Sequence, residues 1–263
     1  MNMQSKKREW KEGFIVMLDA LGVKSRNIDE TNDFLDKYGV IRNRLPYAVK
    51  QIQSLKIALM QDTIIYCFVY DNQSPSVLDD HPIKLRDLLY IIGAHLFHFV
   101  QFAFENGLAF RGVISKGAFI IDDTVSESSE ISSNIVVGPA IYDAASWYEE
   151  SNWIGIMTTP QLSLLIDKWI VSVGPASFEA VFRKYDVPLK NSIAQQVWCL
   201  NWPCSYWTEK PKYQDVIPEY NIIEGDKKFM DDFERMKKSS SDAIKYVNTL
   251  AYYNYIKKIY LSM

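Results

Sequence analysis

Two β-rich runs separated by a single polar pair constrain the fold of this chain more than any other feature. The runs are Leu55–Met60 and Thr63–Val69, and Gln61 and Asp62 lie between them. So short a polar connection between β-rich segments is typical of a hairpin, in which the two strands are antiparallel neighbours. The pattern therefore predicts a β-sheet that carries Asp62 at one of its turns.

Another strand is predicted before the hairpin. Residues 14–22 form a short apolar run that ends in Gly22, and its length fits a buried strand with Asp19 at the C-terminal edge. Further strands are predicted over residues 109–121, 135–138, 153–157 and 195–201, and helices within 28–53, over 83–105 and 139–150, from 160 onward, and over 242–259. This order indicates an α+β fold with helices on one face of the sheet and a C-terminal extension.

The composition sets the limits on function. The chain has 263 residues, 48% of them hydrophobic, which is enough for one large core or a domain plus an appendage. A net charge of −3 lacks the basic excess of a nucleic-acid-binding groove, so no nucleic-acid partner is expected. The three cysteines show no disulfide or zinc pattern, which favours a reducing, cytoplasmic location.

Neither a secretion signal nor a membrane span is expected from the sequence. The basic N-terminal residues precede no signal-type apolar core with a cleavage site. Residues 88–104 are strongly apolar, but they are short for a span and contain His95, His98 and Gln101. We expect a helix buried in the fold or in a dimer.

Two aspartates carry the chemistry that the sequence suggests. If the predicted strands are neighbours in one sheet, Asp19 and Asp62 reach the same rim. Hard divalent cations such as Mg²⁺ prefer oxygen ligands and are often held by one or two carboxylates plus substrate phosphates. Two such ions can assist an in-line displacement at phosphorus. Each Asp alone is as readily explained as a turn residue.

Three basic residues are candidates for binding an anionic ligand. Arg111 begins a predicted strand and could hold a phosphate through two hydrogen bonds, or form a surface ion pair. Lys116 follows an odd number of positions later, so a regular strand directs it to the opposite face. Lys56, on the strand before Asp62, could read a nucleobase carbonyl or lie at a solvated edge.

The helix predicted after Gly138 presents a polar face. Tyr142, Ser146 and Glu149 share that face by their spacing. They are candidates for substrate contact, or for a helix–helix or dimer contact.

These residues, taken in order, resemble the class III nucleotide cyclase catalytic domain over roughly residues 12–160. The family's first strand matches with Asp19 and Gly22 in place, and its second metal-binding Asp, in a hairpin turn, matches Asp62. Its R-x-G-[IV]-x-x-G strand is similar to residues 111–117, and its following helix segment is similar to residues 138–147. Four positions depart from the family pattern, namely Met17, Val23, Tyr142 at the family's Asn and Ser146 at its transition-state Arg.

The resemblance implies a ferredoxin-like cyclase core over residues 12–160 and an extension over residues 161–263. It implies Asp19 and Asp62 as ligands of two Mg²⁺ or Mn²⁺ ions, Arg111 as a catalytic residue, and substrate contacts from Leu21, Gly22, Lys56, Tyr142 and Ser146. It also implies a homodimer with sites at the interface.

Within the class, the chain looks most like the stand-alone Pycsar cyclases of bacterial antiphage defence, including in residues 197–203 and 245–250. That likeness implies UTP, or less readily CTP, as substrate, and a separate effector that responds to the cyclic product. Three alternatives remain open. They are an inactive homologue that binds a nucleotide or a protein, an enzyme making diguanylate or oligonucleotide signals, and a dimerisation module that uses the helix at 83–105.

Overall fold

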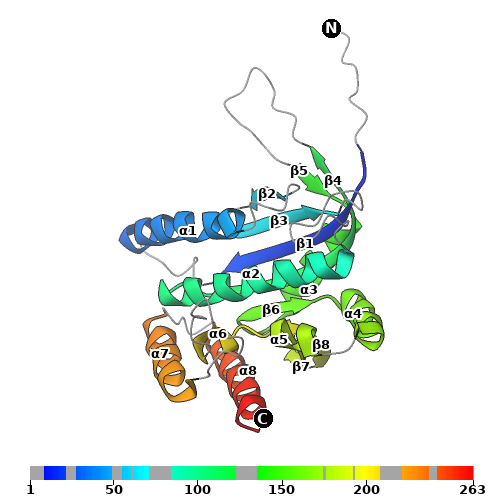
Figure 1. Cartoon of the computed structure of the whole chain (residues 1–263). Helices are drawn as coiled ribbons and strands as arrows, with labels where there is room; N and C mark the ends of the chain where they lie inside the picture. The colour runs from blue at the N-terminus through cyan, green and yellow to red at the C-terminus, as the bar shows by residue number, and fades with distance from the viewer. Residues whose placement is uncertain are drawn as a thin grey trace.

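The computed structural model describes residues 9–21, 28–48, 55–60, 62–70, 84–122, 135–173, 176–191, 193–207, 221–236 and 242–262. One mixed sheet runs through them in the order β2-β3-β1-β4-β6-β8-β7, and β5 pairs with the far end of β4 (Figure 1). The strands are β1 (Lys11–Ala20), β2 (Leu55–Met60), β3 (Thr63–Val69), β4 (Phe110–Asp122), β5 (Ile135–Val137), β6 (Gly155–Thr158), β7 (Phe182–Pro188) and β8 (Ala194–Leu200). The helices are α1 (Ile28–Ala48), α2 (Leu85–Glu105), α3 (Pro139–Glu150), α4 (Pro160–Val173), α5 (Ala176–Val181), α6 (Cys204–Trp207), α7 (Ile222–Arg235) and α8 (Ala243–Leu261).

The α+β class is confirmed, and so is the hairpin. β2 and β3 have the predicted limits and pair antiparallel, with Met60 opposite Thr63. β1 lies between β3 and β4 and is antiparallel to both. β6 joins β4 in parallel, as expected for a crossover connection that contains a helix.

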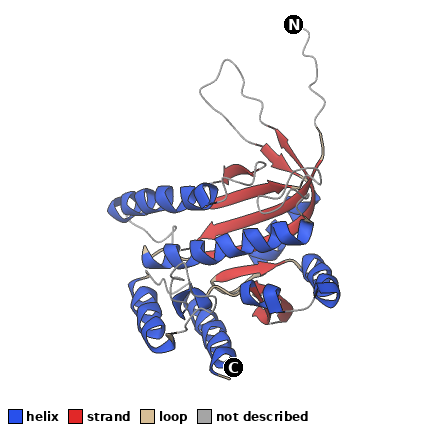
Figure 2. Ribbon diagram, viewed as in Figure 1, coloured by secondary structure: helices blue, strands red, loops and turns tan. Residues whose placement is uncertain are grey.

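Helices cover both faces of the sheet, whereas the sequence predicted them on one face. Phe110 packs against Tyr38 of α1 and Phe99 of α2, whereas the hydroxyl of Ser115 donates to the carbonyl of Ala140 in α3. Positions 110 and 115 are an odd number apart, so they face opposite sides of β4. α3 therefore covers the second face, and Figure 2 shows it behind the sheet while α1 and α2 lie in front.

The apolar run of β1 explains this double coverage. Phe14 through Leu18 are at most 4% exposed, so both faces of the strand are buried. Near-continuous apolar strands are typical of sheets with both faces covered. The C-terminal part contributes to the second face too, because Tyr252 of α8 contacts Trp153 and Tyr185.

α2 is a core helix in this fold. It is the one helix among the described ranges that is long and apolar enough to cross a membrane, and more than half of its most apolar window is buried inside the protein. Its buried side chains recur at helical spacing, including Leu89, Ile92, Leu96 and Phe99. That stripe packs on the sheet, as an amphipathic core helix does.

Replacement of Gly13 by alanine should destabilise the centre of the sheet. A Cβ on Gly13 would lie 2.0 Å from the backbone oxygen of Phe68, across the β1–β3 pair. Because backbone cannot move away without breaking the ladder, we expect a loss of about 1–3 kcal/mol. Gly39→Ala is the matched control, since no heavy atom lies within 4 Å of its new Cβ on α1. It should gain about 1 kcal/mol of helix stability in urea unfolding. Equal midpoints for the two variants would contradict the close approach.

Candidate active site

Asp19 lies at the centre of a polar cluster at the end of β1. It is opposite Thr63 of β3 on one side and Arg111 of β4 on the other. Directly opposite residues in antiparallel strands point to the same face, so the three side chains meet. Arg111 Nε donates to Asp19 Oδ2 at 2.9 Å, and Thr63 Oγ1 donates to Asp19 Oδ1 at 3.4 Å. Only 8% of Asp19 is exposed, so the ion pair is largely shielded from water.

Asp62 lies beside this cluster in the turn of the β2–β3 hairpin. Its backbone oxygen accepts a hydrogen bond of 3.1 Å from the amide of Ala20, which fixes the turn against the end of β1. Asp62 is partly buried, and its charge acts on Asp19. The structure thus brings the two predicted carboxylates, distant in sequence, to one rim of the sheet.

The electrostatics of the rim disfavour further negative charge. Burial raises the pKa of Asp19, the charge and hydrogen bond of Arg111 oppose that rise, and the neighbouring Asp62 carboxylate adds to it. A cation bound between the carboxylates would relieve the repulsion between them. The rim is therefore suited to an added positive charge.

Arg111 is held in place from two further directions. Its Nη1 donates to the backbone oxygen of Ser151 at 3.4 Å, and its guanidinium carbon lies 5.0 Å from the ring centre of Tyr148. That distance is in the range of a cation–π contact. Burial and the negative charge of Asp19 raise the pKa of the Tyr148 hydroxyl, so Tyr148 stays neutral next to the ion pair.

Tyr148 and Ser151 are the site residues that the sequence reasoning missed. The residues predicted on α3, Tyr142 and Ser146, lie on its polar face, whereas Tyr148 lies on the opposite face. Ala140 and Ala144 are buried against the sheet, and Tyr148 is the next residue in the same i, i+4 series. The small–small–aromatic stripe was the available signal, because it places an aromatic ring over the end of β4.

The C-terminal extension supports the same corner of the site. Asn248 of α8 donates to the backbone oxygen of Asn152 at 2.6 Å, and the amide of Ile154 donates to Thr249 Oγ1 at 2.8 Å. These two bonds fix the segment directly after Ser151. The carbonyl that accepts from Arg111 is therefore positioned in part by the last helix of the chain.

The predicted substrate-binding residues whose side chains the structure describes, Leu21, Tyr142 and Ser146, make no described hydrogen bond to Asp19, Asp62 or Arg111. Tyr142 is 78% exposed, and the exposed Ser146 donates its hydroxyl back to the Tyr142 carbonyl at 2.9 Å. Leu21 is buried and donates its amide to Ala109. Lys56 pairs in β2 with Cys67. The side chain of Lys56 and the whole of Gly22 lie outside the described residues.

Lys116 belongs to a different part of the molecule. It lies an odd number of positions after Arg111 on β4 and pairs with Glu12 at 2.6 Å. The sequence prediction that Arg111 and Lys116 would not face one site therefore agrees with the structure.

The donor set at the rim fits a hard divalent cation. In the described ranges no group of three His, Cys, Asp or Glu side chains could enclose a metal ion, so a zinc-type cage is not present there. One or two carboxylates, with substrate oxygens completing the coordination, are instead the protein share that is usual for Mg²⁺. A cation at Asp19 would share that carboxylate with Arg111, which donates to Oδ2, and with Thr63, which donates to Oδ1.

Comparisons with known proteins give structural likeness without sequence likeness. No family model matches the chain, and none of the curated proteins matches it. The adenylyl cyclase CyaB from P. aeruginosa aligns with a TM-score of 0.49 and 8% identity, over 80% of this chain and 100% of that one. The guanylate cyclase domain of RhGC from Catenaria anguillulae, in complex with GTP, aligns with a TM-score of 0.42 and 13% identity, over 73% and 97%. The dimeric guanylyl cyclase domain of RhoGC from Blastocladiella emersonii gives 0.43 and 14%, over 73% and 96%.

Proposed function

We propose that this protein is a nucleotidyl cyclase that converts a nucleoside triphosphate to the 3′,5′-cyclic monophosphate and pyrophosphate. The observation that carries the proposal is the convergence of Asp19, Asp62 and Arg111 at one rim, from the neighbouring strands β1 and β4 and from the turn of the β2–β3 hairpin. The order of motifs in the sequence supports it independently.

Each residue has a definable task in this reaction. Asp19 and Asp62 would hold two Mg²⁺ or Mn²⁺ ions, which when bound supply charge neutralisation at the triphosphate and activation of the attacking oxygen. The ribose 3′-oxygen forms a new bond to the α-phosphorus, and the bond to the pyrophosphate oxygen breaks. Arg111 donates two of its five N–H groups to Asp19 and Ser151, so the other N–H groups can stabilise the departing pyrophosphate. The ring of Tyr148 holds the guanidinium group of Arg111 in this orientation.

We further propose that the active form is a homodimer. Tyr142 and Ser146 are exposed on α3 and lie apart from the cluster of their own chain, which suits contact with a substrate held by the partner subunit. The base-reading groups would then come partly from that subunit. We also propose a cytoplasmic location, because the spacing of the three cysteines in the sequence fits no disulfide framework.

We propose UTP as the preferred substrate over CTP, and a role as the signalling enzyme of an antiphage system with a separate effector. This finer proposal rests on the sequence resemblance and on the size of Tyr142, which would narrow the space for a base held by the partner subunit. Tyr142→Asn should shift the ratio of purine to pyrimidine turnover toward purines by about tenfold, in the range of one lost pocket contact. Competition assays with ATP and UTP measure the ratio, and an unchanged ratio would remove Tyr142 from base selection.

Product analysis tests the central proposal. Purified protein with Mn²⁺ and all four nucleoside triphosphates should yield one dominant cyclic nucleotide by mass spectrometry, together with stoichiometric pyrophosphate. Absence of any cyclic product would favour the alternative of an inactive homologue that binds a nucleotide or a protein partner. Two observations favour that alternative, namely Ser146 at the family's arginine position and the ion pair that already engages Asp19.

A further inference from the structure

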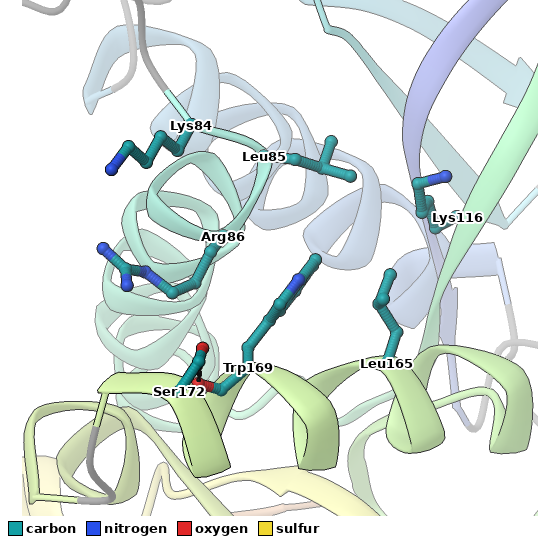
Figure 3. A pocket seen from close by; sticks show the side chains of 7 residues that line it. All are labelled: Lys84, Leu85, Arg86, Lys116, Leu165, Trp169 and Ser172. Atoms are coloured by element: carbon teal, nitrogen blue, oxygen red, sulfur yellow. Dashed lines mark hydrogen bonds between the residues drawn. The ribbon is translucent and has the colours of Figure 1, made fainter.

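A ligand-sized pocket lies on the opposite face of the sheet from Asp19. It has a volume of about 410 Å³, within the range of small-molecule sites. Its lining comes from the start of α2, from β4 and from α4 (Figure 3), and consists of Lys84, Leu85, Arg86, Lys116, Leu165, Trp169 and Ser172. Lys116 and Arg111 face opposite sides of β4, so this pocket is separate from the aspartate rim.

The described lining of the pocket combines an apolar wall with three cations and contains no acidic side chain. Trp169 and Leu165 of α4 project toward Leu85, and Figure 3 shows Lys84 and Arg86 extending on one side of the indole and Lys116 on the other. Arg86 forms an ion pair of 2.6 Å with Asp87, and Lys116 forms one of 2.6 Å with Glu12, so both positive charges are partly neutralised. Lys84 is exposed and has no ion-pair partner in the described ranges.

Two of these cations stand at the N-terminal end of α2, where Asp87 of the first turn pairs with Arg86 alone. Lys84 is the N-cap residue of α2 and makes no side-chain capping bond, and Arg86 lies in the first turn. The N-terminal end of a helix carries partial positive charge, which favours anions and repels cations. Asp87 offsets Arg86 and Glu12 offsets Lys116, so Lys84 is the cation of this pocket that no acidic side chain in the described ranges pairs with. An anionic ligand would compensate that charge.

We infer that this pocket binds a nucleoside monophosphate, with the phosphate at Lys84 and Arg86 and the base on Trp169. An indole and a nucleobase stack through their π-faces, and Lys116 at the far side can donate to a base carbonyl or ring nitrogen. A bare inorganic anion would leave the apolar wall unused. The site is independent of the proposed cyclase reaction, because none of its residues contacts Asp19, Asp62 or Arg111 in the described bonds.

Equilibrium binding of AMP in the presence of EDTA tests this inference. AMP has no pyrophosphate to lose, and EDTA removes the divalent ions that the aspartate rim would need. We expect saturable binding, with adenosine and inorganic phosphate each at least about tenfold weaker than AMP. Lys84→Ala and Trp169→Ala should each weaken AMP binding at least about fivefold, since a charge contact or a stacked base is lost. Added salt should weaken it further.

Matched variants locate the binding. Lys168→Ala removes an exposed cation adjacent to Trp169 that does not line the pocket, so it should leave AMP binding unchanged. Asp62→Ala should leave it unchanged as well. Lys84 is exposed, so Lys84→Ala keeps the test decisive if Trp169→Ala fails to fold. The inference is overturned by lack of saturation up to millimolar AMP, by equal binding of phosphate alone, by normal binding in folded Lys84→Ala, or by loss of binding in Asp62→Ala.

Discussion

Asp62→Ala should lower cyclase turnover at least about a thousandfold while the protein stays folded. Loss of one preorganised hydrogen-bond donor typically costs about 10²–10³ in rate, and loss of a cation ligand should cost no less. Asp62 has no counterpart among the described acidic residues at that rim, where Asp19 would be left to hold the ions alone. Steady-state rates of cyclic nucleotide formation at saturating Mn²⁺ measure the effect.

The folded state should tolerate this change because the Asp62 side chain contributes little to it. The contact that fixes the turn is made by its backbone oxygen, which alanine retains. We therefore expect a urea midpoint close to that of the wild type. Asp231→Ala, which removes an exposed carboxylate from α7, is the matched control and should keep full turnover. Near-normal turnover in folded Asp62→Ala would refute the two-carboxylate site.

Much of the sheet could be predicted from local sequence. The hairpin, the buried β1 run and the Pro139 helix start each depend on residues that are close in sequence, and all three were found with nearly correct limits. β7 was missed because only Phe182 and Val187 of this strand are buried, so no continuous apolar run marks it in the sequence. α7 was missed as well, although its Asn221 cap and amphipathic pattern are local signals.

The site could be predicted only in part, for a physical reason. Asp19 and Asp62 stand at a strand end and a turn, and those positions can be inferred from the chain. The pairing of Asp19 with Arg111, and the approach of Tyr148, depend on the register between β1 and β4 and on how α3 lies across them. Register and helix placement are set by packing between distant segments, which no local pattern encodes.

Arg111→Gln should reduce turnover by about 10²–10³ and also leave a buried carboxylate without its partner. Arg111 donates to Asp19 where both side chains are only 12% exposed. Glutamine can offer a neutral donor but no charge to the departing pyrophosphate. Tyr148→Phe is a matched control from the same cluster, because it keeps the ring that contacts the guanidinium and should retain most of the turnover.

The stability of metal-free Arg111→Gln should depend on pH more steeply than that of the wild type. Burial already raises the folded-state pKa of Asp19, so the proton is held more tightly in the folded than in the unfolded chain. That stabilisation is complete below about pH 4, the unfolded value, and is lost as pH rises through the folded pKa. Without Arg111 the folded-state pKa of Asp19 rises further, so the loss of stability extends to higher pH. In EDTA, the difference between the unfolding free energies at pH 4 and at pH 7 should therefore be larger for the variant than for the wild type.

The double variant Asp19→Asn with Arg111→Gln separates charge from chemistry. It replaces the ion pair by two neutral amides, so no uncompensated charge remains buried, and that charge is the main cost of breaking such a pair. We expect unfolding at pH 7 to return close to the wild-type value while turnover stays at the level of the least active single variant. Recovery of turnover along with stability would mean that the pair only supports the fold. Recovery of stability alone places Asp19 and Arg111 in the reaction itself.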